Sequence, residues 1–213
     1  MAGRFITLEG GEGCGKTTQI AAIAERLERR NIECILTREP GGSPGAEAIR
    51  EILVKGSVDR WDAMTEALLM YAARRDHVEQ LIKPTLKENK WVISDRFFDS
   101  TMAYQGLAGA LGEFYVSELR TMVLDDFAPD LTLILDLPAD VGLKRARSRM
   151  TATGHDHEDR FEGKGLGYHQ KLRQAYLDIA AREPERCHVI DASGDETEVA
   201  AKIWRNIQSH FAL

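Results

Sequence analysis

A glycine-rich stretch near the start of the chain carries the clearest chemical signal. Residues 10–17 match the pattern G-x-x-x-x-G-K-S/T, in which glycines let the backbone wrap closely around phosphate groups. The N–H groups of such a loop, and of the helix that follows it, present partial positive charge to an anion. Lys16 is expected to reach the outer phosphates, and the Thr17 hydroxyl to ligate Mg2+. The residues expected to contact the nucleotide here are Gly10, Gly11, Glu12, Gly13, Cys14, Gly15, Lys16, Thr17 and Thr18.

The absence of two sequence signatures narrows the choice of nucleotide. The dinucleotide fingerprint G-x-G-x-x-G does not occur at this turn, so ATP or GTP is preferred over NAD. The guanine signature N-K-x-D of switch GTPases is also missing, because the nearest string, at residues 89–92, lacks the aspartate. Kinases, motors and switches share the phosphate loop, so the acceptor of the phosphate must be sought elsewhere in the chain.

A second set of charged residues follows two other predicted strands. Arg38 lies in the string T-R-E-P-G-G, and Asp95 and Arg96 lie in D-R-F. The carboxyl ends of parallel strands are where ligands bind in open α/β sheets. The planar fork of Arg38 suits a phosphate monoester, although a salt-bridged loop arginine remains the alternative. Asp95 is a candidate magnesium ligand or general base, and Arg96 a candidate clamp on the phosphoryl group.

Short apolar runs alternate with helical patterns and predict the elements that carry these residues. We expect strands at 5–8, 33–37, 91–94, 131–135 and 188–190, and a helix at 17–30 whose apolar residues recur at helical spacing. This alternation predicts an α/β fold, a five-stranded parallel sheet with helices on both faces. With the phosphate loop, it is a three-layer sandwich of P-loop NTPase type, a single domain over 1–213. The polar, glycine-bearing segment 150–167 is expected to form a lid.

Composition excludes several classes of partner. With 28 Lys and Arg against 34 Asp and Glu, the net charge of −6 disfavours nucleic-acid binding. The longest apolar run, 67–73, is far shorter than the about 20 residues that span a bilayer, so no membrane partner is expected. Three cysteines do not form a disulfide framework, and a reducing cytoplasmic location is expected.

Taken in order, six strings resemble one family. They are E-G-x-E-G-x-G-K-T, T-R-E-P-G-G, Y-A-A-R, D-R-F, S-T-x-A-Y-Q-G and D-R-F-E, and together they resemble thymidylate kinase (dTMP kinase) of the bacterial type. The resemblance runs from Phe5 to about residue 192. It implies Mg2+-dependent transfer of the γ-phosphoryl group of ATP to dTMP, giving dTDP, in a homodimer. The alternatives are a related nucleoside monophosphate or deoxynucleoside kinase, and a non-catalytic nucleotide-binding regulator.

The resemblance also implies roles for single residues. The carboxylate matching Glu12 contacts the deoxyribose 3′-hydroxyl, the arginine matching Arg38 binds the acceptor phosphate, and the arginine matching Arg74 binds a thymine carbonyl. Lys16 and Arg96 match residues that act on the transferring phosphoryl group. The remaining matches are Asp95 and Thr17 near the magnesium ion, Thr101 and Gln105 near the base and sugar, Tyr104 against the 2′ position, and Arg145 against adenine.

Two positions bear on how this chain fits the pattern. Met70 stands where the family usually places a phenylalanine that stacks on thymine, and a thioether can also cover a ring face. Gly13 stands where the eukaryotic type has a catalytic arginine. In the bacterial type, lid arginines supply that charge, and the candidates are Arg145, Arg147, Arg149 and Arg160, with Arg149 and Arg160 preferred as catalytic residues.

Overall fold

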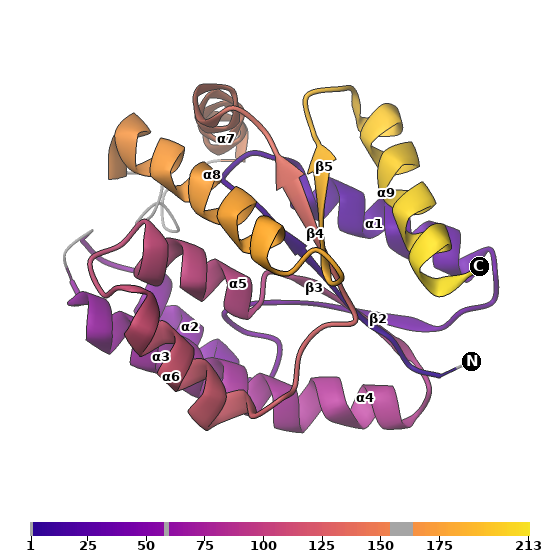
Figure 1. Ribbon diagram of the computed structural model, residues 1–213, viewed down its shortest axis with the longest axis horizontal. Helices are drawn as coiled ribbons and strands as arrows, with labels where there is room; N and C mark the ends of the chain where they lie inside the picture. Colours follow the sequence, from indigo (N-terminus) through magenta and orange to yellow (C-terminus); the bar gives the residue numbers. More distant parts are fainter. Residues whose placement is uncertain (1, 58–59, 154–163) are drawn as a thin grey trace.

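The computed structural model describes residues 2–57, 60–153 and 164–213, without the side chains of 149–153. Five strands form one sheet in the order β2-β3-β1-β4-β5, and every pair is parallel. The predicted five-stranded parallel α/β fold is therefore confirmed (Figure 1). The strands are β1 (Phe5–Glu9), β2 (Cys34–Arg38), β3 (Trp91–Asp95), β4 (Leu131–Asp136) and β5 (Cys187–Asp191).

Helices connect the strands, as parallel pairing requires. Two π-helical segments, η1 and η2, continue α3 into α4 and extend α5. The elements are α1 (Lys16–Glu28), α2 (Pro44–Val54), α3 (Ala63–His77), η1 (Val78–Ile82), α4 (Lys83–Lys87), α5 (Phe98–Thr101), η2 (Met102–Leu107), α6 (Glu113–Leu124), α7 (Ala139–Thr153), α8 (Gly165–Arg182) and α9 (Glu196–Phe211).

Alternation along the central strand separates two apolar layers. Ile6 and Leu8 of β1 pack on the face covered by α1 and α9, whereas Phe5 packs among residues of α3, α5 and α6 on the other face. On that second face β1 also presents Thr7 and Glu9, which are both fully buried. A polar side chain in such a position must find hydrogen-bond partners within the protein. The second face therefore combines an apolar layer with a polar one near the strand ends.

The strand predictions were correct in place and short at the carboxyl end. β1, β3 and β4 each extend one residue further, to Glu9, Asp95 and Asp136. The apolar pattern stops at these carboxylates, but their backbone groups still pair, with Leu8 opposite Asp95 and Asp136 opposite Asp191. Because the strands are parallel, these carboxylates and Arg38 lie at one edge of the sheet.

The helix boundaries differ from those expected. α1 spans Lys16–Glu28, so it begins before and ends before the expected 17–30. Of the expected lid segment 150–167, residues 150–153 belong to α7 and 165–167 to α8. Although this sequence is polar and bears glycines, both helices extend into it. Lys164 directly precedes α8, and residues 154–163 lie outside the described residues.

The apolar run 67–73 is part of α3, and its side chains divide between two environments. Ala67, Tyr71 and Ala73 are buried in the protein, while Leu68 is half exposed. Across the parts of the chain that the structure describes, no helix has the length and apolar character needed to cross a bilayer.

Candidate active site

The loop between β1 and α1 is shaped by glycines that adopt backbone angles other residues resist. Gly10 has φ 133° and Gly15, directly before α1, has φ 95°. The Lys16 ammonium turns back over the loop and donates to the carbonyl oxygens of Gly10 (3.2 Å) and Gly11 (3.1 Å). Cys14 differs from its neighbours because its side chain packs into the core beneath the loop. The loop therefore offers backbone groups and one ammonium to a ligand.

A polar cleft lies directly over this loop. Thr17 on α1 and Asp95 at the end of β3 meet there, with 3.4 Å between Thr17 Oγ1 and Asp95 Oδ2. The other carboxylate oxygen, Asp95 Oδ1, is buried and has no hydrogen-bond partner among the described residues. We call this cleft the phosphate cavity, and its lining residues are Glu12, Gly13, Gly15, Lys16, Thr17, Thr18, Arg38, Glu39, Arg50, Asp95 and Arg96.

The Thr17–Asp95 pair fits a magnesium ion. Mg2+ is held in proteins by one or two oxygen side chains together with substrate phosphates and water. A hydroxyl and a carboxylate oxygen that lacks a partner are donors of that kind. Over the described parts of the chain there is no cluster of three His, Cys, Asp or Glu side chains that would form an all-protein site.

A second cavity adjoins the first. It has a volume of about 150 Å³ and opens between α3, α5 and the loop after β2. We call it the acceptor pocket. It shares four residues with the phosphate cavity, which are Glu12, Glu39, Arg50 and Arg96. Its other lining residues are Pro40, Val54, Met70, Arg74, Phe97, Ser100, Thr101, Tyr104 and Gln105.

Arg96 stands where the two cavities meet. Its backbone has φ 71°, a left-handed conformation that costs a non-glycine residue about 1–3 kcal/mol and that the surrounding structure must enforce. The Arg96 carbonyl accepts from Ser94 Oγ at 2.8 Å, and its N–H donates to Leu8 at 2.9 Å. The guanidinium donates to Glu12 Oε1 (3.0 Å) and to Gly10 O (3.1 Å). Its position is therefore specified by both the backbone and the loop.

Glu12 is kept ionised by its neighbours. Burial alone would raise the pKa of Glu12, but the nearby charges of Arg96 and Lys16, and a hydrogen bond from Tyr104, outweigh burial and lower that pKa to about 2. The Tyr104 hydroxyl donates to Glu12 Oε1 at 2.5 Å. A carboxylate that stays ionised can accept a hydrogen bond, for example from a sugar hydroxyl, over the whole physiological pH range.

Arg74 on α3 reaches the floor of the acceptor pocket with one donor to spare. Its Nε donates to Glu39 at 2.7 Å, and its Nη2 donates to the Phe97 carbonyl (3.1 Å) and to Thr101 (3.0 Å). Its other terminal nitrogen, Nη1, is buried without a hydrogen-bond partner among the described residues. An unsatisfied buried donor is costly, so a ligand acceptor is expected to complete it.

Of the other predicted acceptor-side residues, Met70 and Gln105 line the same pocket, whereas Arg38 lines the phosphate cavity. Met70, one helical turn before Arg74, is largely buried. Gln105 also lines the pocket, and its amide nitrogen donates to Glu66 at 2.6 Å. Arg38 lies in the phosphate cavity and is half exposed, and among the described residues its guanidinium bonds to the exposed carboxylate of Glu47. An exposed pair of this kind is weak, so an incoming phosphate can replace Glu47.

Sequence reasoning missed the residues that support Arg74. Glu39 accepts from Arg74 on one oxygen, and its other oxygen lies 3.0 Å from His77 Nδ1. His77 is fully buried, and its Nε2 lies 2.7 Å from Thr37 Oγ1. Glu39 belongs to the T-R-E-P-G-G string that was noted for Arg38, but its partners on α3 are set by tertiary packing.

Arg50 was also missed. It lies on α2 and lines both cavities, and its Nη1 donates to the Pro40 carbonyl at 2.8 Å. It is a second cation at the meeting point of the cavities. Its helical position, 12 residues beyond Arg38, gave no signal in the sequence.

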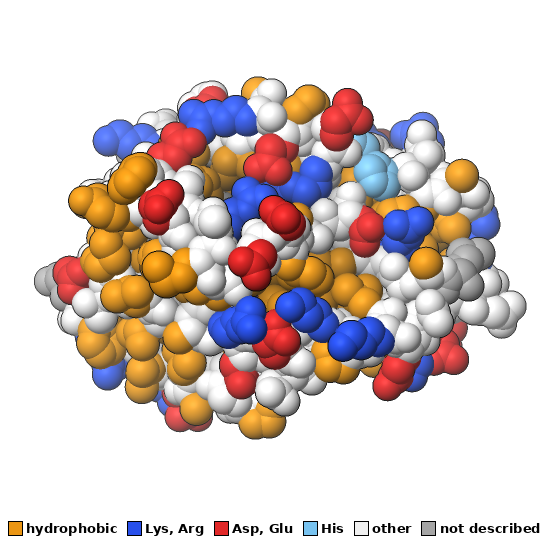
Figure 2. Space-filling view, turned by 60° about the horizontal axis from the view of Figure 1, so that its bottom comes forward, with side chains coloured by type: hydrophobic (Ala, Val, Ile, Leu, Met, Phe, Trp, Pro, Cys, Tyr) orange, Lys and Arg blue, Asp and Glu red, His pale blue; other side chains and the backbone are white. Residues whose placement is uncertain are grey.

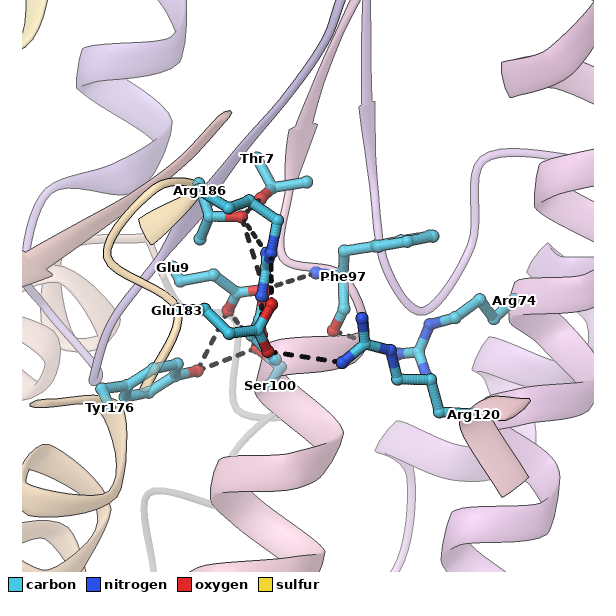
Figure 3. A network of polar contacts seen from close by, with 11 residues as sticks. Thr7, Glu9, Arg74, Phe97, Ser100, Arg120, Tyr176, Glu183 and Arg186 are labelled. Atoms are coloured by element: carbon cyan, nitrogen blue, oxygen red, sulfur yellow. Dashed lines mark hydrogen bonds and ion pairs between the residues drawn. The ribbon is translucent and has the colours of Figure 1, made fainter. Parts of the chain in front are cut away.

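Glu9 takes part in a buried polar network (Figure 3). Two of its partners, Ser100 and Tyr176, also contact Arg96. Glu9 Oε1 accepts from the Phe97 N–H at 2.7 Å, and Glu9 Oε2 accepts from Ser100 Oγ (2.6 Å) and from Tyr176 Oη (3.1 Å). Burial and repulsion by Asp99 raise the pKa of Glu9 to about 7, although Arg96 and these hydrogen bonds oppose the rise. Glu9 opens the loop motif in the sequence, but its partners come from α5 and α8.

Of the four candidate lid arginines, the structure describes the side chains of Arg145 and Arg147. Arg145 is exposed on α7 and does not line either cavity. The side chains of Arg149 and Arg160 lie outside the described residues, so their predicted role stays a prediction. α7 itself packs closely on the loop, because a Cβ on Gly13 would lie 2.1 Å from the Gly142 carbonyl oxygen. An arginine at position 13 would therefore collide with α7.

The sheet order, the glycine loop after β1 and the two adjoining cavities define a P-loop nucleotide-binding protein with room for a second ligand. A model of the thymidylate kinase family matches residues 8–203. The thymidylate kinase of Caulobacter vibrioides is 55% identical over 201 residues, 94% of each chain. That of Afipia carboxidovorans is 51% identical over 210 residues, 99% of this chain and 91% of the relative.

A solved structure shows the same relationship. The crystal structure of thymidylate kinase from Ehrlichia chaffeensis matches with a TM-score of 0.77 at 34% identity, and covers 98% of this chain and 99% of that one. This chain therefore belongs to the thymidylate kinase family, and the resemblance found in the sequence is confirmed.

The raised pKa of Glu9 makes folding depend on pH in a defined direction. The pKa is about 7 in the fold and 4.5 for a free side chain, so this group stabilises the fold relatively more at low pH, and that contribution is lost as the pH rises through 7. Glu9→Gln cannot ionise. We expect the free energy of unfolding of Glu9→Gln, relative to that of wild type, to increase by up to about 3 kcal/mol as the pH rises from about 5 to about 8. Urea unfolding across this range measures the difference, with exposed Glu118→Gln as control, and parallel pH curves for Glu9→Gln and wild type would contradict the assignment.

Proposed function

We propose that this chain transfers the γ-phosphoryl group of ATP to the 5′-phosphate of dTMP, giving ADP and dTDP. Membership of the thymidylate kinase family supports this reaction. The observation that carries the assignment of substrates to sites is the junction of the two cavities at Glu12 and Arg96. The triphosphate of ATP takes the phosphate cavity, dTMP takes the acceptor pocket, and their phosphates meet beside Arg96.

The phosphate groups are held by backbone amides and by cations. Lys16 exchanges its two carbonyl partners for phosphate oxygens, and Arg38 leaves Glu47 to bind the acceptor phosphate. Arg96 faces the transferring group. The acceptor phosphate is already an anion, so catalysis consists mainly of alignment and neutralisation of charge.

Thr17 and Asp95 are the residues that would hold Mg2+ with ATP. When bound, the ion neutralises charge on the outer phosphates. Asp95 Oδ1 is free of hydrogen bonds within the described structure, which suits this role better than a structural one. Thr18, in the first turn of α1, also lines the phosphate cavity.

The acceptor pocket has the chemistry to bind a thymidine nucleotide. The unpartnered Nη1 of Arg74 would donate to a thymine carbonyl, and Met70 would cover the face of the ring. Thr101 and Gln105 lie beside the base and sugar. Tyr104, held by its bond to Glu12, would crowd a 2′-hydroxyl while Glu12 accepts from the 3′-hydroxyl.

We also propose that the chain is one catalytic domain whose segment 150–167 closes over the phosphates. Arg149 and Arg160 would then supply charge to the transferring group, and Arg145 would lie against adenine. The fit of Gly13 against α7 supports a cation from elsewhere in the chain. A cytoplasmic location is consistent with three free thiols, at Cys14, Cys34 and Cys187.

The reaction is tested directly by incubating the purified chain with Mg-ATP and a panel of nucleoside monophosphates. We expect dTDP and ADP in equal amounts with dTMP, and little product with the other members of the panel. ATP hydrolysis that does not depend on any acceptor, without dTDP, would contradict the proposed function.

Arg74 is expected to act on dTMP alone. Arg74→Lys keeps a charge beside Glu39 but loses the planar fork and its free donor, so the KM for dTMP should rise about tenfold or more, with little change in the KM for ATP. Arg75→Lys is the matched control, because Arg75 follows on the same helix and faces the surface. An equal rise in both KM values for Arg74→Lys would place this residue outside the base site.

A homodimer formed through α3 and α6 is proposed from exposed apolar side chains. Phe114, Tyr115 and Met122 on α6 are 67%, 52% and 78% exposed, and Leu68 on the adjacent α3 is 50% exposed. Figure 2 shows apolar side chains gathered on the left half of this face. A buried charge would oppose association, so Met122→Glu should give a monomer in light scattering. Val189→Glu on the edge strand β5 is the control, and a Met122→Glu dimer as stable as wild type would contradict this interface.

A further inference from the structure

Glu9 is the first residue of the loop motif, and the proposed mechanism assigns it no task. It ends β1, is fully buried, and does not line either cavity. A buried carboxylate at this place is expensive unless it is bonded on both oxygens. Glu9 has three donors, and two of them are hydroxyl groups that also contact Arg96.

These contacts join a carboxylate to a guanidinium through two hydroxyls. Ser100 Oγ lies 2.6 Å from Glu9 Oε2 and 3.1 Å from Arg96 Nη1. Tyr176 Oη lies 3.1 Å from each of the same two atoms. Figure 3 shows the hydroxyls of Ser100 and Tyr176 turned toward Glu9.

The two ends of this chain of contacts fix the direction of their hydrogen bonds. An ionised carboxylate can only accept, and an arginine can only donate. Each hydroxyl therefore turns a lone pair toward Arg96 Nη1. Its one proton goes to Glu9, directly or through the other hydroxyl, because Ser100 Oγ and Tyr176 Oη also lie 2.9 Å apart. The carboxylate thus fixes the orientation of two acceptors, and these acceptors hold one nitrogen of the guanidinium.

The four residues come from four parts of the fold. Glu9 ends β1, Arg96 follows β3, Ser100 lies on α5 and Tyr176 lies on α8. Arg96 keeps two further acceptors, Gly10 O and Glu12, so loss of the hydroxyls would leave it in the site but with its guanidinium less firmly oriented. The contacts with the two hydroxyls therefore affect the orientation of the guanidinium more than whether it lies in the site.

We propose that Glu9 is a positioning residue for Arg96, acting through the hydroxyls of Ser100 and Tyr176. The proposal rests on the proposed function, in which Arg96 faces the transferring phosphoryl group. Charge develops on that group in the transition state, so a misaligned guanidinium weakens binding of the transition state more than binding of the substrates. The signature is a fall in kcat with KM values that change little.

Single variants test whether Glu9 and the two hydroxyls affect catalysis. Tyr176→Phe and Ser100→Ala each remove one acceptor from Arg96, and each should lower kcat about tenfold at about pH 8, with both KM values within about twofold of wild type. Glu9→Gln should lower kcat at least as far, because an amide nitrogen cannot accept from the hydroxyls. Thr7→Val is the matched control. It removes a buried hydroxyl from the same strand, one bonded to Thr132 and not to Arg96, and should leave kcat unchanged.

A double-mutant cycle tests whether the effect of Tyr176 acts through Arg96. In an Arg96→Lys background the compact ammonium cannot use the same acceptors, so Tyr176→Phe should cause no further loss of kcat. A purely structural role of Tyr176 predicts the same fold loss in both backgrounds. Thermal unfolding of each variant confirms that folded protein is compared.

The outcomes separate the two proposals. Equal losses from Tyr176→Phe in both backgrounds, or single variants that keep kcat within about twofold of wild type, would overturn the positioning role while wild type still forms dTDP. An Arg96→Lys variant with unchanged kcat would overturn the role of Arg96 and the positioning role together. A wild-type chain that forms no dTDP would overturn the proposed function itself.

Discussion

The guanidinium of Arg96 lies at the junction of the two cavities, and much of the surrounding structure serves to hold it there. A left-handed backbone turns the side chain back over the sheet edge, and acceptors from the loop, α5 and α8 receive its protons. An arginine whose fork is fixed in advance binds a phosphate more tightly, because ordering a long side chain costs conformational entropy. In this fold the Arg96 side chain is already ordered before any substrate binds.

Buried arginines recur under the site, and each is paired with a carboxylate. Arg74 bonds to Glu39, and Arg186 bonds to Asp99 through both terminal nitrogens, at 2.7 and 2.9 Å. The Asp99–Arg186 pair lies beside the Glu9 network and ties α5 to the start of β5. Removing one partner of such a pair would leave an uncompensated buried charge, which costs about 3–5 kcal/mol. These pairs tie α3 to the loop after β2 and α5 to the start of β5, and a fixed arrangement of these elements suits a reaction that depends on alignment.

The parallel sheet explains why loops far apart in sequence share one site. Parallel strands end at the same edge, so the residues after β1, β2 and β3 converge without any local signal between them. The central position of β1 brings its loop between those of its neighbours β3 and β4. α7, which follows β4, then packs on the loop through the close contact of Gly13 with Gly142.

The sequence by itself determined the strands, the phosphate loop and the family, because apolar periodicity and short motifs are local properties of the chain. It also indicated Arg38, Asp95 and Arg96, since residues directly after strands in a parallel sheet must lie at one edge. Only the tertiary structure decided which side chains meet there. Glu9 finds Tyr176, 167 positions away, and Arg74 finds Glu39, 35 positions away. Such pairs form because buried charges must find partners, and those partners are set by how helices pack on the sheet and not by spacing along the chain.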